Sequence, residues 1–107
     1  MKCAICLITF LAVLITVGQV HAQAGLGDRQ EGLALAQQVC SECHAIRGGQ
    51  VRSPTSRAPT FSELATAPGM TAVALTVALT TPHAGMPMFE LTASQREGVI
   101  AYILSLR

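Results

Sequence analysis

The chain has 107 residues, of which 50% are hydrophobic, and its seven Lys and Arg against six Asp and Glu give a formal net charge of +1. This length allows one small domain, and a domain of this size often needs a metal, a disulfide or a cofactor to be stable. The balanced charge argues against a nucleic-acid-binding protein, because such proteins carry a strongly basic surface.

The first 22 residues carry the pattern of a secretory signal peptide. Lys2 gives a positive start, residues 3–17 form an apolar run, and small residues precede a cleavage point near Ala22-Gln23. The run is shorter than the ~20 apolar residues that a membrane-spanning helix needs, which disfavours the alternative of an uncleaved anchor. We therefore predict a cleaved signal peptide at 1–22, a single domain at 23–107, and export to the periplasm.

Asp28 opens the first predicted helix, because an aspartate caps helix N-termini well and Glu31 stands where a capping box requires it. Gly32 and Ala36 then recur at helical period toward Cys43, which gives this helix an apolar inner stripe. The helix is expected to end at the two cysteines.

The five-residue sequence Cys40-Ser41-Glu42-Cys43-His44 is the attachment motif of c-type haem. At helical spacing the two thiols and the imidazole project from one side of a turn. Each thiol can then add across one vinyl group of the porphyrin while His44 faces the iron. A thioredoxin-like redox pair would need an α/β context, and a zinc site would need four ligands, and the predicted elements supply neither.

The rest of the chain is predicted to alternate loops with helical segments. In order, we expect a loop at 45–60, a helical turn after Pro59, a helix at 71–79, a loop at 81–91 and a last helix capped by Thr92. Gln95 is placed to complete a capping box in that last helix. No convincing run of alternating strand residues is present, so the predicted fold class is all-α.

Several features in this order resemble a class I cytochrome c over residues 28–107. They are Gly32 eight positions before Cys40, the motif at 40–44, Met86-Pro87 in the second loop, and Val99-Ile100-Ala101-Tyr102 in the last helix. The resemblance implies a cytochrome c-like fold of three to four helices, with loops wrapped around one covalently attached haem c. In the family the first and last helices cross at the position of Gly32, and the tyrosine packs there. Gly98 and Ala36 depart from the family pattern and are expected to weaken this crossing slightly.

The resemblance also implies the ligands of the haem iron. His44 is the expected proximal ligand, and Pro59 matches the proline whose carbonyl orients that histidine, with Pro54 as the competing candidate. Met86 is the expected sixth ligand, because the family's ligand usually stands before a proline and Pro87 follows here. A thioether ligand favours ferrous iron and raises the reduction potential.

Other residues remain candidates for the haem environment. Met88 is the second candidate for the sixth ligand, while His83 in that role would give a bis-histidine, low-potential haem. Met70 is expected to fill the core, and Arg57 is the preferred partner of a haem propionate among the arginines of the first loop. The expected pocket or core residues are Phe61, Leu64, Leu75, Leu79, Phe89 and Tyr102.

The expected function is one-electron transfer by a small exported cytochrome c that docks transiently with redox partner proteins. No catalytic dyad or nucleophile constellation is apparent, so we do not expect an enzyme. We expect neither nucleic-acid binding nor membrane insertion once the signal peptide is removed. One alternative is a cytochrome subunit of a periplasmic dehydrogenase or oxidase complex. Another is a haem protein with an open iron face for small ligands.

Overall fold

The computed structural model describes residues 27–107, and the predicted signal peptide with its cleavage point lies outside these described residues. The described part is helical, as expected, and its order of elements is α2 (Arg29–Gln38), η1 (Cys40–Glu42), α3 (Phe61–Thr66), α4 (Ala72–Thr80) and α5 (Ala93–Leu104). None of the helices within residues 27–107 is long and apolar enough to cross a membrane.

Side-chain caps set the starts of α2 and α5, as the sequence predicts. Asp28 caps α2, because its Oδ1 accepts hydrogen bonds from the backbone N–H groups of Gln30 (2.8 Å) and Glu31 (3.3 Å). The return bond from the Glu31 side chain that the predicted capping box needs does not form in α2. In α5 the box is complete, since Thr92 and Gln95 each accept from the other's backbone N–H.

Two further caps set the starts of the shorter helices. Thr60 and Glu63 form a complete capping box at α3, with bonds of 2.6 and 3.1 Å, so the predicted helical turn is a capped helix of six residues. Thr71 Oγ1 accepts from the N–H of Ala74 at α4. Each cap satisfies backbone donors that have no partner within the first turn of a helix.

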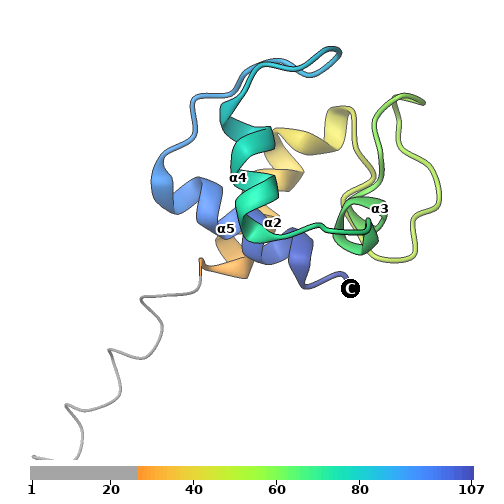
Figure 1. Cartoon of the computed structure of the whole chain (residues 1–107). Helices are drawn as coiled ribbons and strands as arrows, with labels where there is room; N and C mark the ends of the chain where they lie inside the picture. Colours follow the sequence, from red (N-terminus) through yellow and green to blue (C-terminus); the bar gives the residue numbers. More distant parts are fainter. Residues whose placement is uncertain (1–26) are drawn as a thin grey trace, which may run out of the picture.

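Helix α5 is the centre of the fold, because α2, α3 and α4 all pack against it. Figure 1 shows α4 beside α5 and, at its upper end, the chain continuing into the loop of residues 81–91. The buried core includes Val99, Ile100 and Ile103 of α5 together with Phe61 and Leu75. The C-terminus is held in place as well, since Arg107 donates to the carbonyl oxygens of Ala65 and Met70 at 3.2 and 2.6 Å.

The crossing of α2 and α5 differs from the expectation in one respect. A Cβ placed on Gly32 would lie 2.0 Å from the Gly98 carbonyl oxygen, and one placed on Gly98 would lie 3.0 Å from the Asp28 oxygen. Gly98 therefore allows the two backbones to touch, and the prediction that it weakens the crossing is wrong. The atoms nearest to a Gly32 Cβ belong to Gly98 and Val99 rather than to Tyr102.

Candidate functional site

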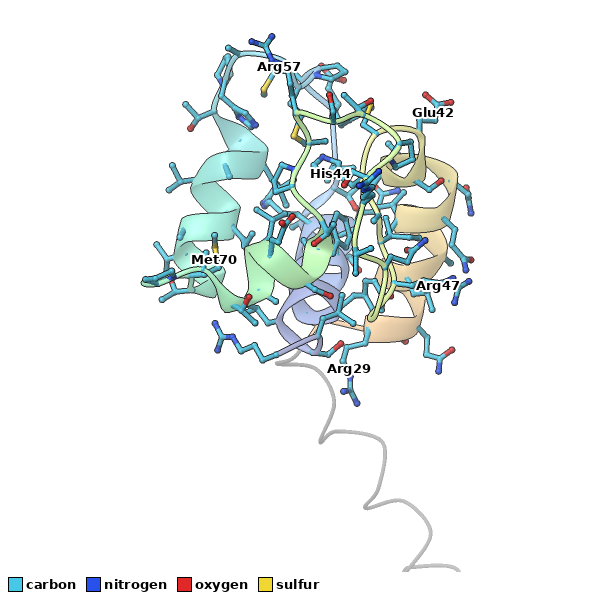
Figure 2. The ribbon with its side chains drawn as sticks, turned by 90° about the vertical axis from the view of Figure 1, so that its right-hand side faces the viewer. Arg29, Glu42, His44, Arg47, Arg57 and Met70 are labelled. Atoms are coloured by element: carbon cyan, nitrogen blue, oxygen red, sulfur yellow. The ribbon has the colours of Figure 1, made fainter. Side chains whose placement is uncertain are left out.

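The turn that follows α2 carries both cysteines and the histidine of the attachment motif. Both Cys43 N–H and His44 N–H donate to the Cys40 carbonyl oxygen, at 3.1 and 2.9 Å, and close a tight helical turn. The Ser41 hydroxyl donates back to the Gln37 carbonyl at 2.7 Å. Figure 2 shows Glu42 projecting away from the molecule while His44 lies toward its middle. The motif therefore folds into one tight helical turn, and its two thiols and imidazole on one side of that turn remain a prediction.

Both cysteines are free thiols and both are half-buried. Burial raises the pKa of the Cys40 thiol above its usual value. The thiols of redox and nucleophilic sites have lowered pKa values, because positive charge or a helix N-terminus stabilises the thiolate. Cys40 has the opposite environment, which disfavours the thiol-oxidoreductase alternative for this pair.

The His44 ring is held from one side by the loop that precedes α3. Its Nδ1 lies 2.7 Å from the carbonyl oxygen of Pro59, the residue named by the sequence prediction in preference to Pro54. Because a carbonyl can only accept, Nδ1 carries the proton and donates. The lone pair of the neutral ring is then on Nε2, which is the state that a metal-binding histidine requires.

Backbone and side-chain hydrogen bonds fasten the loop at 45–60 to the attachment turn. Phe61 N–H donates to the Ala45 carbonyl at 2.9 Å, and Thr55 N–H donates to the Cys43 carbonyl at 3.2 Å. Ser53 Oγ accepts from the N–H of Ala45, the residue directly after His44, at 3.0 Å. Sequence analysis missed this role of Ser53, since one serine among several in a polar loop carries no local signal.

Tyr102 connects the same loop to the core of the protein. Its buried hydroxyl donates to the Ile46 carbonyl oxygen at 2.8 Å, across 56 positions of sequence. Its ring centroid lies 6.3 Å from that of Phe61, which in turn lies 5.6 Å from that of His44. Tyr102 of α5 therefore connects to the attachment turn in two ways. Its hydroxyl bonds to Ile46, and its ring is linked to that of His44 through Phe61 of α3.

Removing the Tyr102 hydroxyl is expected to destabilise the fold without changing the haem. Tyr102→Phe leaves the Ile46 carbonyl without its donor, which costs about 1–2 kcal/mol for a buried acceptor. Chemical unfolding followed by circular dichroism measures this loss. Ser105→Ala on the exposed end of α5 is the control, and its effect should be smaller. Equal stability of Tyr102→Phe and the unmodified protein would contradict the role of this hydrogen bond.

The loop at 81–91 contains the candidate sixth ligands. Met86 is half-buried and its backbone pairs with His83 in an isolated bridge, where Gly85 turns the chain at φ +85°. Met88 is 51% exposed, and His83 is exposed, with Nδ1 3.1 Å from the Thr81 carbonyl.

The candidate pocket residues divide into two groups. Phe61, Leu75 and Tyr102 are buried in the protein core. Leu64, Leu79 and Phe89 are only half-buried. Met70 packs against the core, as predicted.

The residues present fit a covalently attached haem. Two free thiols and an imidazole with Nδ1 already occupied project from one turn, and half-buried apolar side chains remain available to a flat apolar group. Arg57, the predicted partner of a propionate, is exposed and reaches the end of the molecule where the loop at 81–91 lies (Figure 2).

Comparison with known proteins identifies the class to which this helical fold and its thiol–imidazole turn belong. The cytochrome c family profile matches residues 30–107, so the chain belongs to the cytochrome c family. Over 97 residues the chain is 30% identical to cytochrome c-552 of Bradyrhizobium diazoefficiens, an alignment that covers 91% of this chain and 92% of that protein. No solved structure matches the chain.

Family membership gives the cofactor and the general role of the chain. Cytochromes c carry covalently attached haem c, and Cys40 and Cys43 fit the attachment motif. The chain is therefore a haem-based electron carrier, and proteins of this kind are generally not enzymes.

Proposed function

We propose that this chain is an exported one-electron carrier whose haem is attached through Cys40 and Cys43, and that His44 and Met86 would hold the iron. The observation that carries the proposal is the 2.7 Å hydrogen bond between His44 Nδ1 and the Pro59 carbonyl. It fixes the ring plane and the tautomer, so that Nε2 points away from the loop with its lone pair free.

When bound, the haem supplies an iron that gains or loses a single electron. The side chains around the haem would orient its histidine ligand, exclude water and balance its charge. The Pro59 carbonyl oxygen accepts a hydrogen bond from the Nδ1–H of His44, which makes Nε2 a stronger electron-pair donor. The half-buried Leu64, Leu79 and Phe89 keep water from the site, and Arg57 balances the charge of a propionate. With His44 and Met86 both holding the iron, no substrate would reach the metal.

Met86 is a better candidate for the sixth ligand than Met88. It is less exposed than Met88, and it precedes Pro87, which biases its backbone toward an extended conformation. A thioether is a soft ligand that stabilises ferrous iron, so this ligand pair suits a carrier of relatively high potential. Export follows from the signal-peptide pattern of residues 1–22, and the periplasm is the proposed location.

Met86→Ala tests the ligand pair and the function together. The variant is expected to lose the iron–sulfur charge-transfer band of the oxidised protein, to bind carbon monoxide rapidly when reduced, and to titrate at a lower reduction potential. The unmodified protein should resist carbon monoxide at neutral pH and show one reversible one-electron couple. Optical spectroscopy and a redox titration of the purified holoprotein give these readouts.

Met88→Ala is the matched control, because it removes a second thioether from the same loop. It should keep the charge-transfer band and the resistance to carbon monoxide. Loss of the band in Met88→Ala instead of Met86→Ala would overturn the ligand assignment. Rapid carbon monoxide binding by the unmodified protein would favour the open-site alternative over electron transfer.

A further inference from the structure

The peptide group that joins Pro59 to Thr60 is hydrogen-bonded at both of its ends. Its carbonyl oxygen lies 2.7 Å from Nδ1 of His44 and accepts a hydrogen bond from the ring N–H. Its own N–H donates to Oε2 of Glu63 at 2.6 Å. No peptide bond within residues 27–107 is cis, so the N–H and the C=O of this group point in opposite directions. Glu63 and His44 therefore bind the two ends of one planar unit.

The hydrogen bond to Glu63 is shorter than the corresponding bond in the other capping box of residues 27–107. At α3 the N–H of the N-cap residue donates to a carboxylate at 2.6 Å, whereas at α5 it donates to the neutral amide oxygen of Gln95 at 2.9 Å. Hydrogen bonds to an ionised acceptor are shorter and roughly twice as strong as neutral ones. Thr60 is only 4% exposed, so water screens this bond little. A negative charge therefore acts on the peptide group at short range.

A charge at one end of a peptide group changes the other end, because the amide is conjugated. When the carboxylate attracts the N–H proton, the nitrogen shares more of its electron pair with the carbonyl, and the carbonyl oxygen becomes more negative. The Pro59 oxygen is then a stronger acceptor for the ring N–H of His44. Hydrogen bonds in such chains strengthen one another by roughly 10–30% per bond. The ring of His44 consequently gains electron density, which makes Nε2 a stronger donor to a metal.

Further hydrogen bonds hold both ends of this chain of bonds in place. Glu63 is fixed by the return bond of its capping box, in which its backbone N–H donates to Oγ1 of Thr60 at 3.1 Å. Phe61, one residue after Thr60, donates its N–H to the carbonyl oxygen of Ala45 at 2.9 Å. Ala45 directly follows His44, so this bond ties the backbone beside the histidine to the backbone beside the peptide group. The Pro59 carbonyl is therefore kept directed at the ring.

We propose that Glu63 lowers the reduction potential of the haem by acting on His44 through the Pro59–Thr60 peptide group. The proposal rests on the proposed function, in which Nε2 of His44 holds the iron. A stronger imidazole donor stabilises ferric iron more than ferrous iron, because the ferric ion carries one more positive charge. The proton of Nδ1 stays on His44, and no bond is made or broken. Glu63 contacts neither the iron nor the ring, so it is a positioning residue.

Glu63→Gln tests the proposal, because it removes the charge and keeps an acceptor for the Thr60 N–H. Gln95 shows that a glutamine closes a capping box in this protein, so α3 should keep its cap. In the reduced holoprotein, the nuclear magnetic resonance signal of the His44 ring N–H should move upfield as its hydrogen bond weakens. The reduction potential should rise, and at a fixed applied potential the ratio of reduced to oxidised protein should increase about three-fold.

Glu42→Gln is the matched control for the loss of a negative charge alone. Glu42 is exposed, stands two positions before His44, and projects away from the molecule (Figure 2). Solvent and salt screen a charge at such a position, so the ring N–H signal should not move and the potential should change less than in Glu63→Gln. Gln95→Glu is the control for the cap, since it places a carboxylate in the box of α5. It should also leave the His44 signal unchanged.

Three results would overturn the inference while the proposed function stands. The first is a His44 ring N–H signal that does not move in Glu63→Gln. The second is a rise in potential no larger than that of Glu42→Gln, which would be a simple effect of charge. The third is a lower potential in Glu63→Gln than in the unmodified protein. Absence of any reversible one-electron couple in the unmodified holoprotein would instead refute the proposed function itself.

Discussion

Replacing both Cys40 and Cys43 with alanine is expected to leave the exported domain without a cooperative thermal unfolding transition. The haem would no longer be attached, and the domain would lose most of the roughly 5–15 kcal/mol that stabilises a typical fold. Thermal unfolding followed by circular dichroism measures the transition, and intact mass measures attachment. The unmodified exported protein should have a mass greater than that of its polypeptide.

We expect this loss of cooperative unfolding because the apolar core of the protein without haem is small. Of the aromatic residues within 27–107, only Phe61 and Tyr102 are buried, and the core around them consists of aliphatic side chains. The loops at 45–60 and 81–91 contain no helix, and they account for a large share of the described chain. Short domains with this much irregular structure usually need a covalent or metal constraint to outweigh the conformational entropy of the chain.

The intervening residues of the motif provide the control. Ser41→Ala and Glu42→Gln change the same turn but keep both thiols, so the haem should stay attached and the transition should remain cooperative. Ser41→Ala loses only the bond to the Gln37 carbonyl, worth about 1 kcal/mol. A cooperative melt of the haem-free double variant would show that the polypeptide alone specifies the fold.

Most features that depend on a few neighbouring residues are predicted correctly from the sequence, although the Glu31 half of the capping box at α2 is not formed. The cap at Asp28, the capping box of Thr92 and Gln95, and the tight turn at Cys40–His44 each arise within five consecutive residues. The contact of His44 with Pro59 spans 15 positions, and its prediction came from the resemblance to the cytochrome c family. Local hydrogen-bonding preferences determine the first group, because their partners are fixed by chain connectivity.

Features that depend on how two distant elements approach each other were mostly missed, and the exception, the crossing of α2 and α5 at Gly32, was expected from the family resemblance. Gly98 looked like a defect in α5, since a glycine inside a helix costs about 1 kcal/mol relative to alanine. Its benefit appears only when Gly32 of α2 is brought against it. The hydrogen bond from Tyr102 to Ile46 is similar, since nothing near either residue in the sequence indicates it. The outward exposure of Val73 and Val77 likewise follows from where α4 packs.

Gly32→Ala is expected to be among the most damaging single substitutions in the chain. The new Cβ would lie 2.0 Å from the Gly98 carbonyl oxygen and 2.3 Å from its carbonyl carbon, and both are backbone atoms that no rotamer change can move away. The helices must separate, which opens the packing around Ala36 and Val99, both almost fully buried. We expect a loss of about 3 kcal/mol or more in the free energy of unfolding, measured with denaturant on the holoprotein.

Gly48→Ala and Gly98→Ala make this prediction specific. A Cβ on Gly48 meets only a Leu106 methyl at 3.9 Å, so alanine should be tolerated there. A Cβ on Gly98 meets the Asp28 oxygen at 3.0 Å, while alanine gains about 1 kcal/mol of helix propensity, so its effect should fall between the other two. If Gly32→Ala were no worse than Gly48→Ala, the backbones of α2 and α5 would not be in direct contact. In that case Tyr102 and the other side chains of α5, rather than the glycine pair, would set the distance between the two helices that hold the haem-attachment turn in place.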